Sequence, residues 1–196
     1  MTTVLAVDLG SASGRVLAGT LTDGRLDVTD IHRFKHEARR RQDGTLTWDV
    51  ATMEAETIIG LKKALEQFPD ARSVSIDTWG VDWAPLDENG DLVGDVIAYR
   101  DERTSRTLDA FRERIGDREF FDLTGNQPAT INTANQLFAY LQENPADAQR
   151  VAGVLFLPDY FVYRLTCAVG WSRTIASTSG LLTPGGGDFN DEVDRK

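Results

Sequence analysis

The chain has 196 residues, of which 41% are hydrophobic and 27% charged, so one large globular domain or most of one is expected. Its formal net charge is −10 and its pI is about 4.7, which argues against a nucleic-acid surface because phosphate backbones need dense lysine and arginine. This charge does not exclude a small phosphorylated ligand, which a local pocket can bind.

Other sequence features favour a cytoplasmic protein without structural cross-links. No stretch reaches the roughly 18 apolar residues of a membrane span, and the N-terminus lacks a signal-peptide pattern. The single cysteine, Cys167, has no partner for an internal disulfide and is expected to be a small buried residue. No cluster of Cys and His suggests zinc, and nothing in the sequence indicates an oligomeric state.

The first third of the chain predicts an antiparallel meander followed by a helix. Strands are expected over residues 3–9, 15–22 and 25–34, with a tight hairpin at Asp23-Gly24. Residues 39–49 look like a polar connection. Apolar residues then recur at helical spacing over residues 50–68, with Asp49 or Thr52 as cap and Pro69 as terminator.

The remainder of the chain predicts one buried strand, a hairpin and a helical region. Residues 73–80 are expected to form the strand, and residues 83–99 a hairpin that turns at Asn89-Gly90. Helices are expected over 101–116, 117–125, 133–145, 146–153 and 157–166, then strand or loop over 170–182 and a glycine-rich, acidic end. This order predicts an α/β fold with a mixed sheet, flanking helices and a helical insertion, as in the ribonuclease H-like half of the actin and sugar-kinase superfamily.

The segment VDLGSASGR, residues 7–15, joins the first two predicted strands. A Walker loop needs a lysine and a following helix, and a dinucleotide fingerprint also needs the helix, so both are excluded. Successive N–H groups of a tight turn form a concavity that binds anions, to which Ser11 and Ser13 add hydroxyls and Arg15 a positive charge. Asp8 would repel a phosphate directly and therefore suits Mg²⁺. A plain glycine-rich hairpin remains the alternative.

Two further stretches place polar and aromatic residues after predicted strands. In SIDTWGVDW, residues 75–83, Asp77 and Asp82 flank an exposed-looking Trp79, an arrangement that suits sugar hydroxyls and sugar C–H groups. The alternative is that the tryptophans are core and the aspartates are turn residues, which is favoured for Trp83. In AYRDERT, residues 98–104, Tyr99 and its charged neighbours suit either a site or an ion-paired helix start.

These stretches together resemble the FGGY carbohydrate kinases. The resemblance rests on AVDLGSASGR, IHRF, TWDV, SIDTWGVDW, AYRDERT, LPDYFVYRLT and TIASTS, spread in family order from residue 6 to about 180, and it is closest to the branch that phosphorylates L-rhamnulose. It implies two ribonuclease H-like domains with ATP, Mg²⁺ and a ketose sugar in the cleft between them. It also implies ATP contacts at Ser11, Ala12, Ser13, Gly14 and Arg15, a metal contact at Asp8, and sugar contacts at Gly80, Trp79, Asp82 and Tyr99.

The same resemblance implies that much of the enzyme lies outside this chain. Family members are more than twice as long, and their catalytic aspartate and adenine-binding half are expected beyond Lys196, so this chain alone is expected to be inactive. Asn126 and Gln127 are weaker sugar-side candidates. The alternatives are a kinase for xylulose or fuculose, a non-catalytic sugar-binding or sensing domain, and an actin-like ATPase, which would lack the DTWGVD sugar wall.

Overall fold

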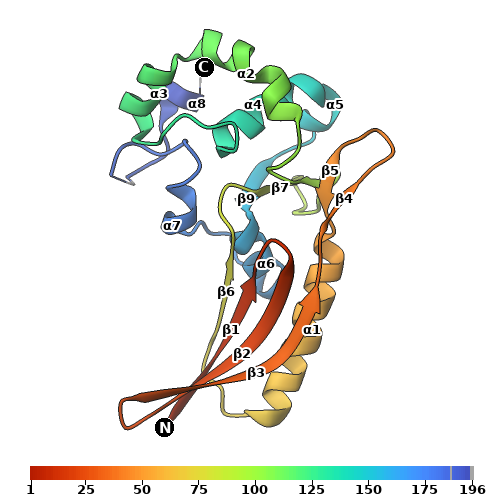
Figure 1. Ribbon diagram of the computed structural model, residues 1–196, viewed down its shortest axis with the longest axis vertical. Helices are drawn as coiled ribbons and strands as arrows, with labels where there is room; N and C mark the ends of the chain where they lie inside the picture. Colours follow the sequence, from red (N-terminus) through yellow and green to blue (C-terminus); the bar gives the residue numbers. More distant parts are fainter. Residues whose placement is uncertain (186, 195–196) are drawn as a thin grey trace.

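A four-stranded mixed sheet forms one end of the molecule in the computed structural model, which describes residues 1–185 and 187–194 (Figure 1). Strands β1 (Thr2–Leu9), β2 (Ser13–Thr22) and β3 (Arg25–Lys35) are antiparallel neighbours, as the predicted meander requires. Strand β6 (Val74–Thr78) runs parallel to β1, so the order is β3-β2-β1-β6.

The register of this sheet brings charged residues together at one end. The hairpin between β2 and β3 turns at Asp23 and Gly24, with φ of 49° and 80°, as the Asp-Gly signal predicted. Arg15 on β2 and Asp77 on β6 are the Cα partners of Asp8 on either side of it. Three charged residues therefore lie side by side where the first turn of the chain begins.

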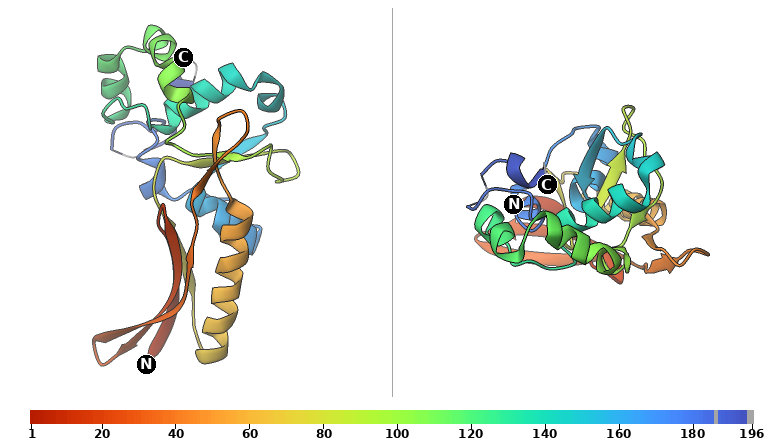
Figure 2. Two further views of the ribbon diagram at one scale, coloured as in Figure 1. Left: turned by 45° about the vertical axis from the view of Figure 1, so that its right-hand side comes forward. Right: turned by 90° about the horizontal axis from the view of Figure 1, so that it is seen from above.

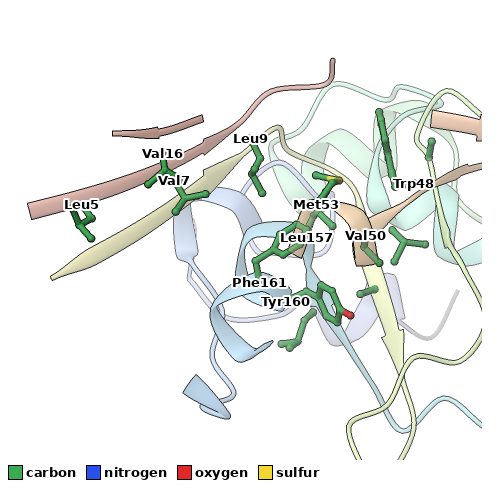
Figure 3. Packing of buried hydrophobic residues seen from close by; sticks show 14 of the residues in the cluster. Leu5, Val7, Leu9, Val16, Trp48, Val50, Met53, Leu157, Tyr160 and Phe161 are labelled. Carbon is green, nitrogen blue, oxygen red and sulfur yellow. The ribbon is translucent and has the colours of Figure 1, made fainter. Parts of the chain in front are cut away.

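Two helices and the sheet enclose the largest core. Helix α1 (Val50–Gln67) starts where Asp49 Oδ1 accepts the Thr52 N–H at 3.0 Å, confirming the predicted cap. Helix α6 (Leu157–Thr166) joins it in the same core. Figure 3 shows side chains of both helices gathered against those of the sheet. Full burial of each such side chain contributes roughly 1.5–3 kcal/mol to folding, so this core fixes the sheet that carries the first turn.

A helical region follows the strands, and it lies at the opposite end of the molecule from the β2–β3 hairpin (Figures 1 and 2). Strand β7 (Trp83–Leu86) pairs with β9 (Gly153–Phe156) between the two ends. The helical insertion predicted from the sequence is therefore present. Its helices are α2 (Arg103–Arg114), α3 (Asp117–Thr124), α4 (Thr133–Glu143) and α5 (Pro145–Ala148). Two short helices, α7 (Arg173–Ala176) and α8 (Asp191–Asp194), come later in the sequence.

The prediction of a plain connection over residues 39–49 is wrong. Strands β4 (Ala38–Arg40) and β5 (Leu46–Trp48) form a hairpin there, closed by a hydrogen bond from Arg41 N–H to the Thr45 carbonyl at 2.8 Å. Its turn contains Asp43-Gly44, the same type of signal that marks the β2–β3 hairpin. The high polarity of the segment concealed this turn, and the hairpin buries Trp48.

The predicted hairpin over residues 83–99 and the predicted helix over 146–153 are only partly correct. The turn occurs at Asn89-Gly90, but β8 (Val96–Ile97) pairs with β5 instead of β7. Helix α5 ends at Ala148, and β9 begins at Gly153 and pairs with β7. These pairings depend on distant segments, which a local pattern does not reveal.

Three smaller expectations also need correction. Residues 170–182, predicted as strand or loop, are mostly loop but contain the short helix α7. Strand β6 lies at the edge of the sheet and is mostly exposed, with Val74 44% exposed, whereas a buried strand was predicted. Cys167 is exposed at the end of α6, with φ of 59°, and not buried.

Gly186 of the predicted glycine-rich end lies outside the described residues. Over the described part of the chain, no helix has the length and apolarity needed to cross a bilayer.

Candidate functional site

The turn between β1 and β2 is tight and partly open to solvent. Its ends are joined by a hydrogen bond from the Gly10 N–H to the Ser13 carbonyl at 2.9 Å. Ser11 is half-buried, whereas Ala12 and Ser13 are exposed. The turn therefore exposes small residues, and no large side chain of its own blocks approach to its backbone N–H groups; their contact with ATP phosphates stays a prediction.

Gly14 has a packing role that the sequence did not reveal. A Cβ at this position would lie 2.3 Å from Cζ of Phe34, on the neighbouring strand β3. Gly14 is buried, so its missing side chain makes room for the Phe34 ring. Contact between Gly14 and an ATP phosphate stays a prediction.

Asp8 and Arg15 form an ion pair at the mouth of the turn. Nη2 and Nε of Arg15 lie 2.5 and 2.7 Å from Oδ2 of Asp8. Their side chains are 39% and 43% exposed for Asp8 and Arg15, so both groups remain accessible to a ligand. The structure thus brings together the residue predicted to bind a metal and the residue predicted to bind phosphate.

The surroundings of Asp8 fit a magnesium ion that arrives with a nucleotide. Among the described residues, no group of three or more His, Cys, Asp or Glu side chains could hold a metal by itself. Mg²⁺ usually keeps several waters and takes one or two carboxylates together with substrate phosphates. Asp8, with Asp77 beside it on β6, matches that modest requirement.

The predicted sugar wall contains a buried carboxylate that holds two tryptophans. Oδ2 of Asp82 accepts the indole N–H of Trp48 at 2.6 Å and that of Trp79 at 2.7 Å. The two ring centroids are 4.5 Å apart. Asp82 is 0% exposed, so its carboxylate faces the indoles instead of an open cleft. Its direct contact with a sugar hydroxyl remains a prediction, and the structure gives it a second role in orienting Trp79.

Burial dominates the electrostatics of Asp82. It raises the pKa of this carboxyl to about 6, while the hydrogen bonds from Trp79 and Trp48 act in the opposite direction. Oδ1 of Asp82 has no hydrogen-bond partner among the residues that the structure describes. An under-satisfied buried carboxylate is costly, and such groups concentrate at functional sites.

His36 connects the predicted phosphate turn with the tryptophan pair, and sequence reasoning missed it. Its backbone N–H donates to the Ala12 carbonyl at 3.3 Å. Its ring stacks on that of Trp79, with centroids 6.0 Å apart and planes 26° apart, and meets Trp48 edge-on. Desolvation lowers the pKa of His36, so the ring is neutral near pH 7. A cavity of about 340 Å³ lies beside it, lined in part by Ala12.

The remaining predicted sugar residues lie near the same wall but in different settings. A Cβ on Gly80 would lie 3.0 Å from Oγ1 of Thr178, which places the TIASTS segment directly against this glycine. Tyr99 is half-buried, and its hydroxyl accepts Nε of Arg100 at 2.8 Å. Trp83 is 4% exposed, so its prediction as a core residue is confirmed.

The weaker candidates Asn126 and Gln127 directly follow the end of α3 and its Gly125 cap. Asn126 donates from Nδ2 to the Ser177 carbonyl at 2.9 Å and lines a cavity that also contains Arg173. Gln127 is exposed. Ser177 lines this cavity, and Thr178, the next residue, lies against Gly80.

Residues 3–194 match the N-terminal domain of the FGGY family of carbohydrate kinases. This chain belongs to that family. A rhamnulokinase from Mannheimia succiniciproducens is 39% identical over 181 residues, which are 91% of this FGGY chain and 37% of the relative. The chain therefore spans less than two-fifths of the length of this curated relative.

Solved structures confirm the fold expected of an FGGY domain. A ligand-bound xylulose kinase from Lactobacillus acidophilus matches with a TM-score of 0.84 at 13% identity, covering 98% of this chain and 39% of the other. Plasmodium falciparum glycerol kinase with ADP matches with a TM-score of 0.83 at 15% identity, covering 100% and 40%. The predicted actin-like, ribonuclease H-like class is therefore correct.

Proposed function

We propose that this FGGY chain provides the phosphate-binding turn and part of the sugar wall of an ATP-dependent ketose kinase. The observation that carries the proposal is the accessible Asp8–Arg15 pair beside a tight turn of small residues. We propose L-rhamnulose as the ketose and L-rhamnulose 1-phosphate as the product. The 39% identity to a rhamnulokinase supports that choice of substrate. We also propose a cytoplasmic location.

The chain contributes positioning and charge neutralisation, which are the main requirements of phosphoryl transfer. In this proposal, backbone N–H groups of residues 11–14 bind ATP phosphate oxygens, and the guanidinium of Arg15 offsets the charge that spreads over the transferred group. Arg15 would exchange its contact with Asp8 for a phosphate oxygen, which its exposure permits. Asp8 would then be free to hold Mg²⁺ or its waters; the ion supplies further neutralisation of phosphate charge when bound.

The ketose would lie against Trp79 and Gly80, with Tyr99 at the side. An aromatic face suits sugar C–H groups, and a residue without a side chain allows close approach of the ligand to the backbone. The proton of the attacking hydroxyl needs a general base within hydrogen-bond reach. We propose that the part of the kinase outside this chain provides that base, together with the second wall of the cleft.

A turnover assay on the full-length protein tests this proposal. ADP release is measured with ATP and Mg²⁺ in the presence of L-rhamnulose, D-xylulose or L-fuculose, and the phosphorylated carbon is identified by ³¹P NMR. We expect L-rhamnulose to give the highest kcat/KM and the 196-residue chain alone to give no turnover. Highest kcat/KM with another ketose would show that this ketose, and not L-rhamnulose, is the preferred substrate. Calorimetric ketose binding without any turnover would indicate a sugar-sensing domain instead.

A further inference from the structure

Val81 has a backbone conformation that a β-branched residue rarely adopts. Its φ is 70°, in the left-handed region, and it lies between Gly80 and Asp82 in the predicted sugar wall. A valine there is a genuine outlier, because its branched side chain crowds the backbone. Such strain persists only where the surrounding structure holds it, and it concentrates at ligand sites.

Two side chains of α4 hold this strained peptide. The Val81 carbonyl accepts Oγ1 of Thr133 at 2.7 Å and Nε2 of Gln136 at 3.1 Å. Nε2 of Gln136 also donates to the Ile131 carbonyl at 2.9 Å. Both α4 residues are 0% exposed, so neither hydrogen bond has to compete with bulk water.

A buried arginine fixes which way the Gln136 amide points. Nη2 of Arg103 lies 2.7 Å from Oε1 of Gln136. A guanidinium can only donate, so the amide oxygen must face Arg103 and the amide nitrogen must face Val81. Arg103 is itself 1% exposed and donates to the Ala98 carbonyl at 3.1 Å. The hydrogen bonds therefore run in one direction: Arg103 donates to Gln136, and Gln136 donates to the Val81 carbonyl.

We propose that Gln136 is a positioning residue for the ketose site, which acts by holding the Val81 carbonyl. The strained peptide sets the direction of the chain between Trp79, which stacks on His36, and Asp82, which orients the Trp79 indole. Without the amide donor, Val81 relaxes towards a negative φ and the wall turns away from the sugar. This inference rests on the proposed ketose kinase function.

The test uses Gln136→Glu in the full-length kinase at pH 8. The carboxylate keeps an acceptor for Arg103 but removes the donor to Val81. The expected result is a fall of about tenfold or more in kcat/KM for the ketose, because small misplacements of a reacting group are costly. The KM for the ketose should rise while the KM for ATP changes less than about twofold, whereas loss of folded enzyme would alter neither KM. Gln142→Glu, an exposed change on the same helix, is the matched control.

The addition of Val81→Gly separates positioning from general destabilisation. Glycine adopts a positive φ without strain, so the double variant should recover most of the lost ketose kcat/KM. Ketose kinetics within about twofold of wild type in Gln136→Glu, or a loss that Val81→Gly leaves unchanged, would overturn the inference. Should Gln136→Glu fail to fold, Thr133→Val is measured instead, with and without Val81→Gly. This variant removes the other hydrogen bond to the Val81 carbonyl, and the same outcomes support or overturn the inference.

The same kinetics distinguish failure of the inference about Gln136 from failure of the proposed kinase function. If the wild-type protein shows no ketose-dependent ADP release, the proposed kinase function fails. If the wild type turns over and Gln136→Glu matches it, the kinase function stands and the positioning role of Gln136 is rejected.

Discussion

Asp8 and Arg15 face each other across the β1–β2 ladder, with Nη2 of Arg15 2.5 Å from Oδ2 of Asp8. Both side chains are about two-fifths exposed. A pair of that kind contributes only about 0–1 kcal/mol to stability. Its two members flank the turn that we propose as the nucleotide site, so we attribute to them a role in ligand binding more than in folding.

Replacing Arg15 should impair catalysis and leave stability nearly unchanged. We expect Arg15→Met in the full-length kinase to lower kcat/KM for ATP by about 10²-fold or more, as loss of a charge-stabilising donor does. The free energy of unfolding should change by about 1 kcal/mol or less. Steady-state kinetics and thermal unfolding measure the two effects. Arg25→Met, an exposed change in the β2–β3 hairpin, is the control, and an equal catalytic loss there would contradict the assignment.

Gly14→Ala should destabilise the domain through Phe34. The added Cβ would lie 2.3 Å from the ring, so the ring must move, at a cost of about 1–3 kcal/mol. Gly19→Ala on the same strand meets nothing closer than 3.4 Å and serves as the control. Thermal unfolding compares them, and Phe34→Leu in the Gly14→Ala background should restore part of the loss. Equal melting temperatures for the two alanine variants would show that the ring moves freely.

The stability of the protein should depend on the ionisation of Asp82. Burial raises its folded pKa to about 6 from the ordinary value of 3.8. The stabilising contribution of the protonated carboxyl is therefore fully present below about pH 3.8 and is lost as the pH rises through about 6. A shift of this size corresponds to about 3 kcal/mol at most.

Asp82→Asn isolates that contribution, because the amide stays neutral and its oxygen can still accept both indoles. We expect the free energy of unfolding of the variant, relative to wild type, to rise between pH 4 and pH 8. Chemical denaturation at a series of pH values measures the difference. A constant difference over that range would mean that Asp82 keeps an ordinary pKa in the folded protein.

Val81→Gly should cost little stability, unlike most replacements of a half-buried valine. Relief of the positive φ is worth about 1–3 kcal/mol, which offsets the lost packing and the greater freedom of glycine in the unfolded chain. Val154→Gly on β9 is the comparison, because that valine is also half-buried but has no positive φ. Similar losses in both variants, measured by thermal unfolding, would argue against stored strain at Val81.

Local patterns predicted the parts of the fold that depend on neighbours in sequence. The opening meander follows from alternating apolar residues and the Asp-Gly turn, and α1 follows from the Asp49 cap and its helical spacing. The pairing of Asp8 with Arg15 is also local, because one short turn joins their strands. The β4–β5 hairpin was missed even though its Asp43-Gly44 signal is present, because its flanking residues are polar.

The interior of the site could not be predicted, because its contacts join distant segments. Trp48 reaches Asp82 across 34 positions, and Gln136 reaches Val81 across 55. No local pattern shows that an indole N–H will point at a particular carboxylate. A positive φ at a valine runs against residue preference, so only the folded structure reveals it.

A crystal structure of the full-length protein with Mg²⁺ and ADP tests the central claim most directly. We predict that phosphate oxygens lie about 3 Å from backbone nitrogens of residues 11–14, with Arg15 turned from Asp8 towards a phosphate and the ion on the Asp8 side. Phosphates bound elsewhere, with the turn empty and the Asp8–Arg15 pair intact, would contradict the account.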